Sequence, residues 1–133
     1  MSQENVEIVR RAFEAFNRDD IDAVVADFAP DCEYIPSGAI PGGADVSRGP
    51  EGYKRWASWL RDEFDDAHLE IHELIDAGDH VWVSLTARGR GKQSGAETSW
   101  HLWHVWTLRD GKLVHGQAFT AREEALEAAG LRE

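Results

Sequence analysis

The amino-acid sequence predicts an α+β domain, in which helices pack into the concave face of a curved, mostly antiparallel sheet. Apolar residues repeat at helical spacing in the first half of the chain and alternate at strand spacing in the second half. The length of 133 residues and the hydrophobic content of 42% suit one domain with one core, spanning residues 1–133. Because a long antiparallel sheet twists and curls, helices laid in its hollow leave a cone with an internal cavity.

Three helices are expected before the sheet. The first covers residues 3–17, and the second follows Asp19-Asp20, a typical N-cap pair, and ends before Pro30. Pro50 suits the first turn of the third helix, because its missing N–H has no helical partner at that position. The apolar face of this helix consists of Tyr53, Trp56, Ala57, Leu60 and Phe64, with Trp59 at its edge.

Between the second and third helices we expect a short strand at residues 32–35 and a loop over 36–49 that is rich in glycine and proline. Thr120 and Glu123 form a capping box that opens a last helix, which ends before Gly130. The four long strands are expected at residues 68–77, 80–90, 97–109 and 112–119.

Composition excludes several classes of partner. The chain has 14 Lys and Arg against 25 Asp and Glu, and its net charge of -11 opposes binding to nucleic acid or to an anionic membrane. The single cysteine, Cys32, excludes an internal disulfide and is expected to be a buried thiol. The N-terminus is acidic and unlike a signal peptide, and no apolar run approaches the ~18 residues of a membrane span. We therefore expect a cytoplasmic protein.

The segment Ser99–Trp106, SWHLWHVW, has two faces because strand side chains alternate. A tight hairpin at Asp110-Gly111 predicts that Trp103 pairs with Ala118 and Val105 with Gly116. One face then holds His101, Trp103, Val105 and Thr107, with Val114, Gly116 and Ala118 opposite. The other face holds Trp100, Leu102, His104, Trp106 and Leu108, with Leu113, His115, Gln117 and Phe119 opposite.

Two stretches of the chain resemble a known family. FNRDDIDAVVADFAPDCEY and HVWTLRDGKLVHG, the latter followed by AREEALEAAGL, are similar to the NTF2-like superfamily, in particular to the SnoaL-like, ketosteroid isomerase-related proteins of bacteria. The resemblance covers nearly the whole chain and implies the same α+β cone. This fold hosts isomerases, cyclases, epoxide hydrolases, dehydratases and non-catalytic binding proteins, so the resemblance does not by itself give an activity.

The catalytic residues of the known enzymes are missing from the matching positions. Those of ketosteroid isomerase fall at Ala12, at or next to Pro36, and at Trp103, and none of these can move a proton. The Asp-Arg-Asp set of limonene epoxide hydrolase has no counterpart. The acid of SnoaL-type cyclases is also absent, because the expected inward positions of the last strand are Val114, Gly116 and Ala118.

The resemblance places the face of Trp103 inside the cone, where His101 would be the acid or base and Tyr34 a hydrogen-bond donor. The walls of the expected pocket for a flat, apolar ligand are Trp56, Trp59, Trp103, Val105, Gly116 and Ala118. The leading hypothesis is a cofactor-free isomerase, cyclase or dehydratase that acts on an apolar, carbonyl-bearing metabolite. Two alternatives stay open: a non-catalytic, homodimeric ligand-binding protein, and a structural dimer whose cone Trp103 fills.

No metal site is expected. His101 and His104 lie on opposite faces of their strand, and His68 and His72 are separated by roughly 13 Å on theirs. His104 and His115 are near neighbours without an evident carboxylate.

The second face predicts a homodimer, since a large exposed apolar patch is unusual for a soluble monomer. The expected interface is the outer sheet face with Trp82, Trp100, His104, Trp106 and Phe119.

Overall fold

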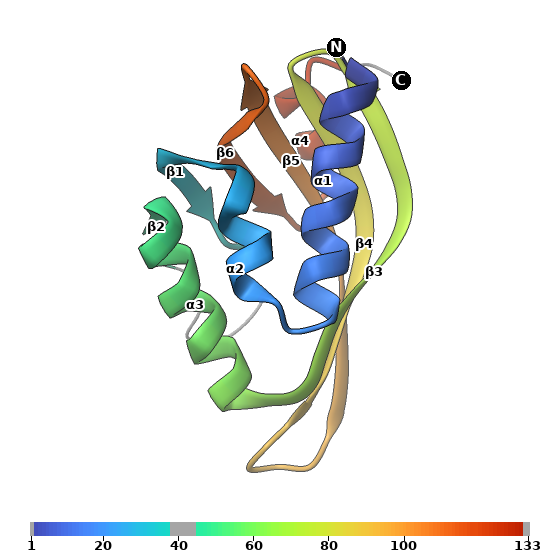
Figure 1. The fold of residues 1–133 in the computed structure, drawn as a ribbon. Helices are drawn as coiled ribbons and strands as arrows, with labels where there is room; N and C mark the ends of the chain where they lie inside the picture. The colour runs from blue at the N-terminus through green and yellow to red at the C-terminus, as the bar shows by residue number, and fades with distance from the viewer. Residues whose placement is uncertain (1, 38–44, 132–133) are drawn as a thin grey trace.

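The computed structural model describes residues 2–37 and 45–131 of the chain. Its centre is a six-stranded sheet in the order β2-β1-β6-β5-β4-β3 (Figure 1). β1 is parallel to β6, and the other neighbours are antiparallel. The strands are β1 Phe28–Ile35, β2 Ser47–Arg48, β3 Phe64–Ala77, β4 His80–Gly91, β5 Glu97–Arg109 and β6 Lys112–Phe119.

The helices lie on both faces of this sheet, unevenly distributed. Figure 1 shows α1, α2 and α3 in front of the curved sheet and the short α4 behind it. The helical elements are α1 Ser2–Asn17, α2 Ile21–Val24, the 3₁₀ turn η1 Val25–Asp27, α3 Gly49–Glu63 and α4 Arg122–Ala128. The α+β cone predicted from the sequence is therefore confirmed, with the helices α1–α3 in the hollow of the sheet.

Most of the local signals act as predicted. The Asp20 side chain accepts a hydrogen bond from the Ala23 N–H at 3.1 Å and so caps α2. Asp110 and Gly111 both have positive φ, 52° and 77°, as a tight hairpin turn requires. The capping box is wrong, because α4 begins after Ala121, which has no side chain that could cap it.

Two strands are longer than predicted. β1 begins at Phe28 instead of residue 32, and β3 begins at Phe64 instead of residue 68. Phe64, which the helical pattern assigns to the third helix, is the C-cap of α3 and already has an extended backbone.

The face assignment of β5 is the main correction to the sequence prediction. Trp106 pairs with Val81, and His104 pairs with Val83. Directly paired residues point to the same side of a sheet, and both valines are fully buried in the core beneath the helices. Trp106 and His104 therefore point into the cone, whereas Trp103 and Val105 point to the outer face.

A bulge in β6 explains why the strand pairs predicted from the hairpin turn are wrong. Leu108 pairs with Leu113 but Thr107 pairs with His115, so Val114 is skipped and the later pairs shift by one residue. Gly116 consequently pairs with Trp106, and Ala118 pairs with His104, in place of the predicted partners. Both small residues do lie on the inner face, as predicted, but Trp103 is not beside them.

The outer patch predicted for the dimer does not form. His104 and Trp106 lie inside the cone, and Trp100 packs edge-on against Phe64, with ring centroids 5.7 Å apart. Trp82 does point outward, but it is completely buried in a cluster with Leu126 of α4. The homodimer itself stays a prediction, because the structure contains a single chain.

Candidate ligand site inside the cone

An aromatic cluster fills the hollow between the sheet and the helices. Tyr34 of β1 stacks on Trp106 of β5, with ring centroids 5.5 Å apart and planes within 8°. Trp56 and Tyr53 of α3 meet the other edges of the Tyr34 ring at 5.1 and 5.5 Å. The phenol of Tyr34 is thus held from three sides, by residues far apart in the sequence.

The place of Trp106 depends on the missing side chain of Gly116. A Cβ atom built on Gly116 would lie 2.3 Å from Cζ3 of the Trp106 ring. No real side chain accepts such a contact, so the indole lies directly on the backbone of β6. Glycine at this point of the strand is what allows a tryptophan on the next strand to lie flat inside the cone.

A small cavity of about 20 Å³ remains between this cluster and α1. Its polar lining groups belong to Tyr53, His104 and Trp106, and no carboxylate lines it. A cavity of this size holds about one water molecule. Any ligand of metabolite size therefore needs some of the lining side chains to change rotamer. The aromatic rings around the cavity are those of Phe13, Phe16, Phe28, Tyr53, His104 and Trp106.

His104 lines this cavity and is 5% exposed. Burial lowers its pKa from 6.5 to about 3, so the imidazole is neutral at physiological pH. The indole Nε1–H of Trp106 donates to His104 Nδ1 at 3.3 Å. A neutral imidazole that accepts at Nδ1 carries its proton on Nε2, and Nε2–H is therefore a hydrogen-bond donor.

The other polar groups of the hollow are neutral as well. Burial, and to a smaller extent Tyr53, raises the pKa of Tyr34 well above its ordinary value. Burial likewise raises the pKa of the Cys32 thiol to about 12, with a smaller contribution from Asp31. The cavity thus offers neutral donors to a ligand, and the described residues that line it include neither a charged group nor a base that works at neutral pH.

The predicted acid–base residue lies on the opposite side of the sheet. His101 Nε2 is 3.0 Å from Ser84 Oγ, and its ring stacks on Trp103 with centroids 4.3 Å apart. The ring of His72 is its other neighbour at 5.6 Å. The prediction that His101 faces the pocket is therefore wrong. Trp103 likewise does not occupy the inner position that the comparison with ketosteroid isomerase assigned to it.

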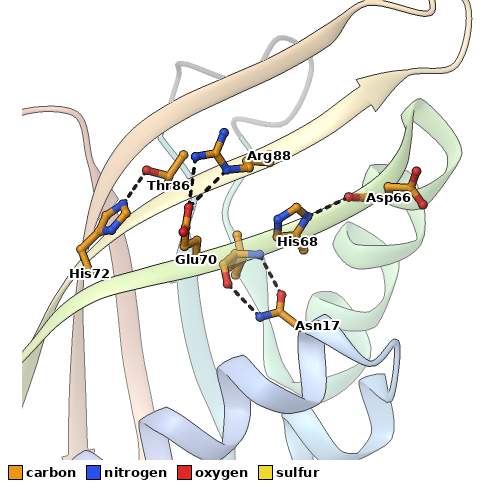
Figure 2. A network of polar contacts seen from close by, with 8 residues as sticks. Asn17, Asp66, His68, Glu70, His72, Thr86 and Arg88 are labelled. Atoms are coloured by element: carbon orange, nitrogen blue, oxygen red, sulfur yellow. Dashed lines mark hydrogen bonds and ion pairs between the residues drawn. The ribbon is translucent and has the colours of Figure 1, made fainter.

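The outer face around His101 is polar. Figure 2 shows His72 pointing to the hydroxyl of Thr86 and Arg88 forked towards Glu70, across strands β3 and β4. The His72 Nε2 to Thr86 Oγ1 distance is 2.7 Å, and Arg88 donates to Glu70 at 3.1 and 3.2 Å. These groups satisfy one another, and they lie across the sheet from the cone.

The structure thus divides the predicted site residues between three places. Tyr34, Trp56, Gly116 and Ala118 come together at the cone interior. His101, Trp103 and Val105 lie on the outer face, with Val105 packed under α4. Trp59 lies on α3, at a surface groove that it shares with Trp56.

Sequence reasoning missed His104, Trp106 and Tyr53 as site residues. The useful signal is the alternating run Val81, Val83 and Leu85, all three of which are fully buried in the core beneath the helices. The pairing of β4 with β5 places Trp106 opposite Val81 and His104 opposite Val83, on the same inner face of the sheet.

No metal centre is found in the part of the chain that the structure describes, which holds no suitable group of three or more His, Cys, Asp or Glu residues. No helix in this part is long and apolar enough to cross a membrane.

The profile of the SnoaL-like domain matches residues 9–116, which is most of the chain. The chain belongs to the SnoaL-like family. The family assignment agrees with the resemblance seen in the sequence and with the α+β cone of the structure. No match was found among curated proteins.

Solved structures with the NTF2-like fold superimpose over almost the whole SnoaL-like chain. An NTF2-like protein from Burkholderia thailandensis is 28% identical with a TM-score of 0.81, covering 96% of this chain and 97% of its own. An NTF2-like protein of unknown function from Burkholderia pseudomallei is 23% identical with a TM-score of 0.80, covering 93% and 95%. A protein of ketosteroid isomerase-like fold from Catenulispora acidiphila, in complex with trimethylamine, is 22% identical with a TM-score of 0.77, covering 95% and 94%.

Proposed function

We propose that this SnoaL-like domain binds a small, apolar molecule with a carbonyl group inside its cone. The observation that carries the proposal is the neutral imidazole of His104 on the wall of a cavity lined mainly by aromatic and aliphatic side chains. With Nδ1 occupied by the Trp106 indole, Nε2–H is the donor that a carbonyl oxygen accepts. Tyr34, which is in ring contact with His104 and protonated, is the proposed second donor.

The apolar surroundings favour this class of ligand. Phe13 packs against His104 with ring centroids 5.6 Å apart, and Phe28 packs against Trp106 at 5.9 Å. Such walls bind flat hydrocarbon surface well and charged groups poorly, because an ion would lose its hydration without gaining a partner. The ligand is therefore uncharged over the part that enters the cone.

Binding is tested with acetophenone, a small aromatic ketone, as the probe. We expect saturable binding by calorimetry, and about tenfold weaker binding to His104→Leu, because one buried hydrogen bond to a carbonyl is worth about 1.4 kcal/mol. The matched control is His68→Leu, an exposed histidine of β3. Equal affinity for the wild type and His104→Leu would contradict the proposal.

Catalysis is the second candidate function, and membership of the SnoaL-like family is the observation that favours it. The isomerase, cyclase or dehydratase hypothesis requires removal of a proton next to the carbonyl, and thus a base. A histidine with a pKa of about 3 is a poor base and a good neutral donor, so we favour the binding function.

Deuterium exchange separates the two functions. If the protein removes α-protons, the methyl signal of acetophenone in heavy water decays faster with protein than with buffer alone, and His104→Leu slows that decay. Our proposal expects binding with no acceleration of exchange. Accelerated exchange that depends on His104 would instead establish the catalytic function.

A further inference from the structure

An open groove of about 450 Å³ lies on the surface beside β2 and the first turns of α3. It is separate from the cone cavity, with which it shares no lining residue. Its walls are Asp45, Val46, Ser47, Arg48, Gly52, Arg55, Trp56 and Trp59.

Two residues of this groove each hold a buried polar atom with no hydrogen-bond partner in the described part of the chain. Ser47 is 8% exposed, and its Oγ is fully buried and unpaired. The indole Nε1–H of Trp56 is also buried and unpaired. Buried polar groups are nearly always paired in native proteins, so two orphans on the wall of one groove indicate a missing acceptor.

The charges around the groove favour an anion as that acceptor. Arg55 is exposed and forms no ion pair with any residue that the structure describes, and Arg48 pairs with Glu33. Asp45 is the opposing charge on the groove wall. The N-terminus of α3 adds the positive end of the helix dipole. Arg48 at the N-cap makes no side-chain capping bond to the first backbone N–H groups of this helix.

The groove also has an apolar wall. Trp56 and Trp59 line it from α3, and Val46, at 45% exposure, is the most exposed large hydrophobic residue in the described part of the chain. Half-buried aromatic surface and an exposed aliphatic side chain, next to unpaired donors, are typical of a ligand site for a molecule with a flat apolar body and one polar end.

We propose that this groove is a second binding site, for a small aromatic carboxylate. The carboxylate pairs with Arg55, and it accepts from Trp56 Nε1–H and Ser47 Oγ–H, which lie below the groove surface, once the side chains that cover them move aside. The aromatic body lies against Trp59 and Val46. This site shares no lining residue with the cavity of the proposed carbonyl site, whose polar groups are neutral, but its Trp56 ring also contacts Tyr34 of that site.

The test is a titration of ¹⁵N-labelled protein with 2-naphthoate, followed through the six tryptophan indole N–H signals. The signal that Trp56→Phe removes identifies Trp56. We expect this signal to move downfield on titration, because an indole N–H that gains a carboxylate acceptor is deshielded. Arg55→Gln should weaken binding about fivefold, as expected for one partly exposed ion pair. The matched control is Arg109→Gln, an exposed arginine at the β5–β6 turn, which should bind like the wild type.

Three results would overturn the proposal. The first is a Trp56 signal that does not respond to 2-naphthoate. The second is equal affinity for the uncharged analogue 2-naphthylmethanol, which would show that charge plays no part. The third is loss of 2-naphthoate binding in His104→Leu with Arg55→Gln unaffected, which would place the acid in the cone. Because acetophenone and 2-naphthoate are titrated separately, failure of one site is distinguishable from failure of the other.

Discussion

At the scale of single residues, the packing of the interior depends on two positions, Gly116 and His104, each of which must meet a specific requirement. Gly116 must have no side chain so that the Trp106 ring can lie on β6. His104 must stay uncharged so that the hollow remains apolar, and its hydrogen bond with Trp106 fixes which nitrogen carries the proton. Both positions act through the same tryptophan, so substitutions at either are expected to disturb the cavity as well as the stability.

The burial of neutral His104 predicts acid sensitivity. As the pH falls below 6.5 the unfolded chain binds a proton at this histidine, whereas the folded chain does not until about pH 3. Stability is therefore lost as the pH falls through this window. Between about pH 7.5 and pH 5, the wild type should lose about 2 kcal/mol more unfolding free energy than His104→Gln, whose amide does not titrate.

Urea denaturation at the two pH values measures this difference. The lowered pKa of His115, caused by burial and by His80, acts in the same direction but is present in both proteins and cancels. Equal losses in the wild type and in His104→Gln would show that His104 is not held neutral.

Gly116→Ala should destabilise the fold by about 3 kcal/mol, at the upper end of the range for overpacked cores, because its Cβ would collide with the Trp106 ring. The colliding atoms belong to the six-membered ring of the indole, and Trp106→Phe replaces the indole with a smaller side chain. The same glycine substitution should therefore cost clearly less in a Trp106→Phe background, as urea unfolding of the four proteins in a double-mutant cycle would show. Additive effects would mean that the two residues do not collide.

At the scale of elements, the sequence predicts which segments are helices and strands but not how one strand is aligned with the next. The helical stripe of α1, the Asp20 cap and the Asp110-Gly111 turn are local signals, and each appears in the structure. The bulge at Val114 has no local signal, because it follows from where Trp106 fits against β6. That single skipped residue changes the partners of Gly116 and Ala118.

The face of a strand is equally a property of its neighbours. Trp103 and Trp106 are both aromatic, and nothing in SWHLWHVW tells which of them points inward. Pairing with Val81 of β4 decides it. Half of the candidate site, Tyr34, Trp56 and the small residues of β6, was therefore predictable, whereas His104 and Trp106 required the sheet register.

The α4 helix covers part of the outer face of the sheet. Leu126 is 6% exposed and packs in a cluster with Trp82 and Val105. Leu126→Ala should lower the unfolding free energy by about 2 kcal/mol, the low end for a buried leucine, because a seven-residue helix can shift to close part of the cavity. Glu127→Ala, an exposed neighbour on the same helix, should stay within about 0.5 kcal/mol of the wild type. Equal midpoints in urea for both variants would show that α4 contributes no packing.

At the scale of the whole molecule, the apolar groups are arranged so that one chain covers nearly all of them. The cone holds the aromatic cluster, α4 covers Trp82, and the large hydrophobic residue most exposed in the described part of the chain is Val46. If Trp106 lay in an outer interface, Trp106→Arg would dissociate a dimer. Because Trp106 lies in the core, this substitution is expected to prevent folding, since it buries a charge. A homodimer, if formed through the outer face, must use the part that α4 leaves open.

We propose that this open part, around His101 and Trp103, is the homodimer interface. Trp103 is half-buried and stacked on His101, and aromatic residues of this kind are enriched at the centre of interfaces. Since each copy carries a net charge of -11, added salt should favour the dimer by screening their repulsion. Native mass spectrometry and a sizing column at low and high salt would measure this.

Trp103→Arg should release folded monomers, because it places a charge at the centre of each copy's interface. Trp59→Arg, the same change at a half-buried tryptophan of α3, should leave the dimer intact. Circular dichroism of both variants shows that they are folded, so that loss of the dimer is not mistaken for unfolding. A wild-type protein that stays at the monomer mass at every concentration and salt would show that the homodimer prediction is wrong, and dissociation of both variants would show that the interface lies elsewhere.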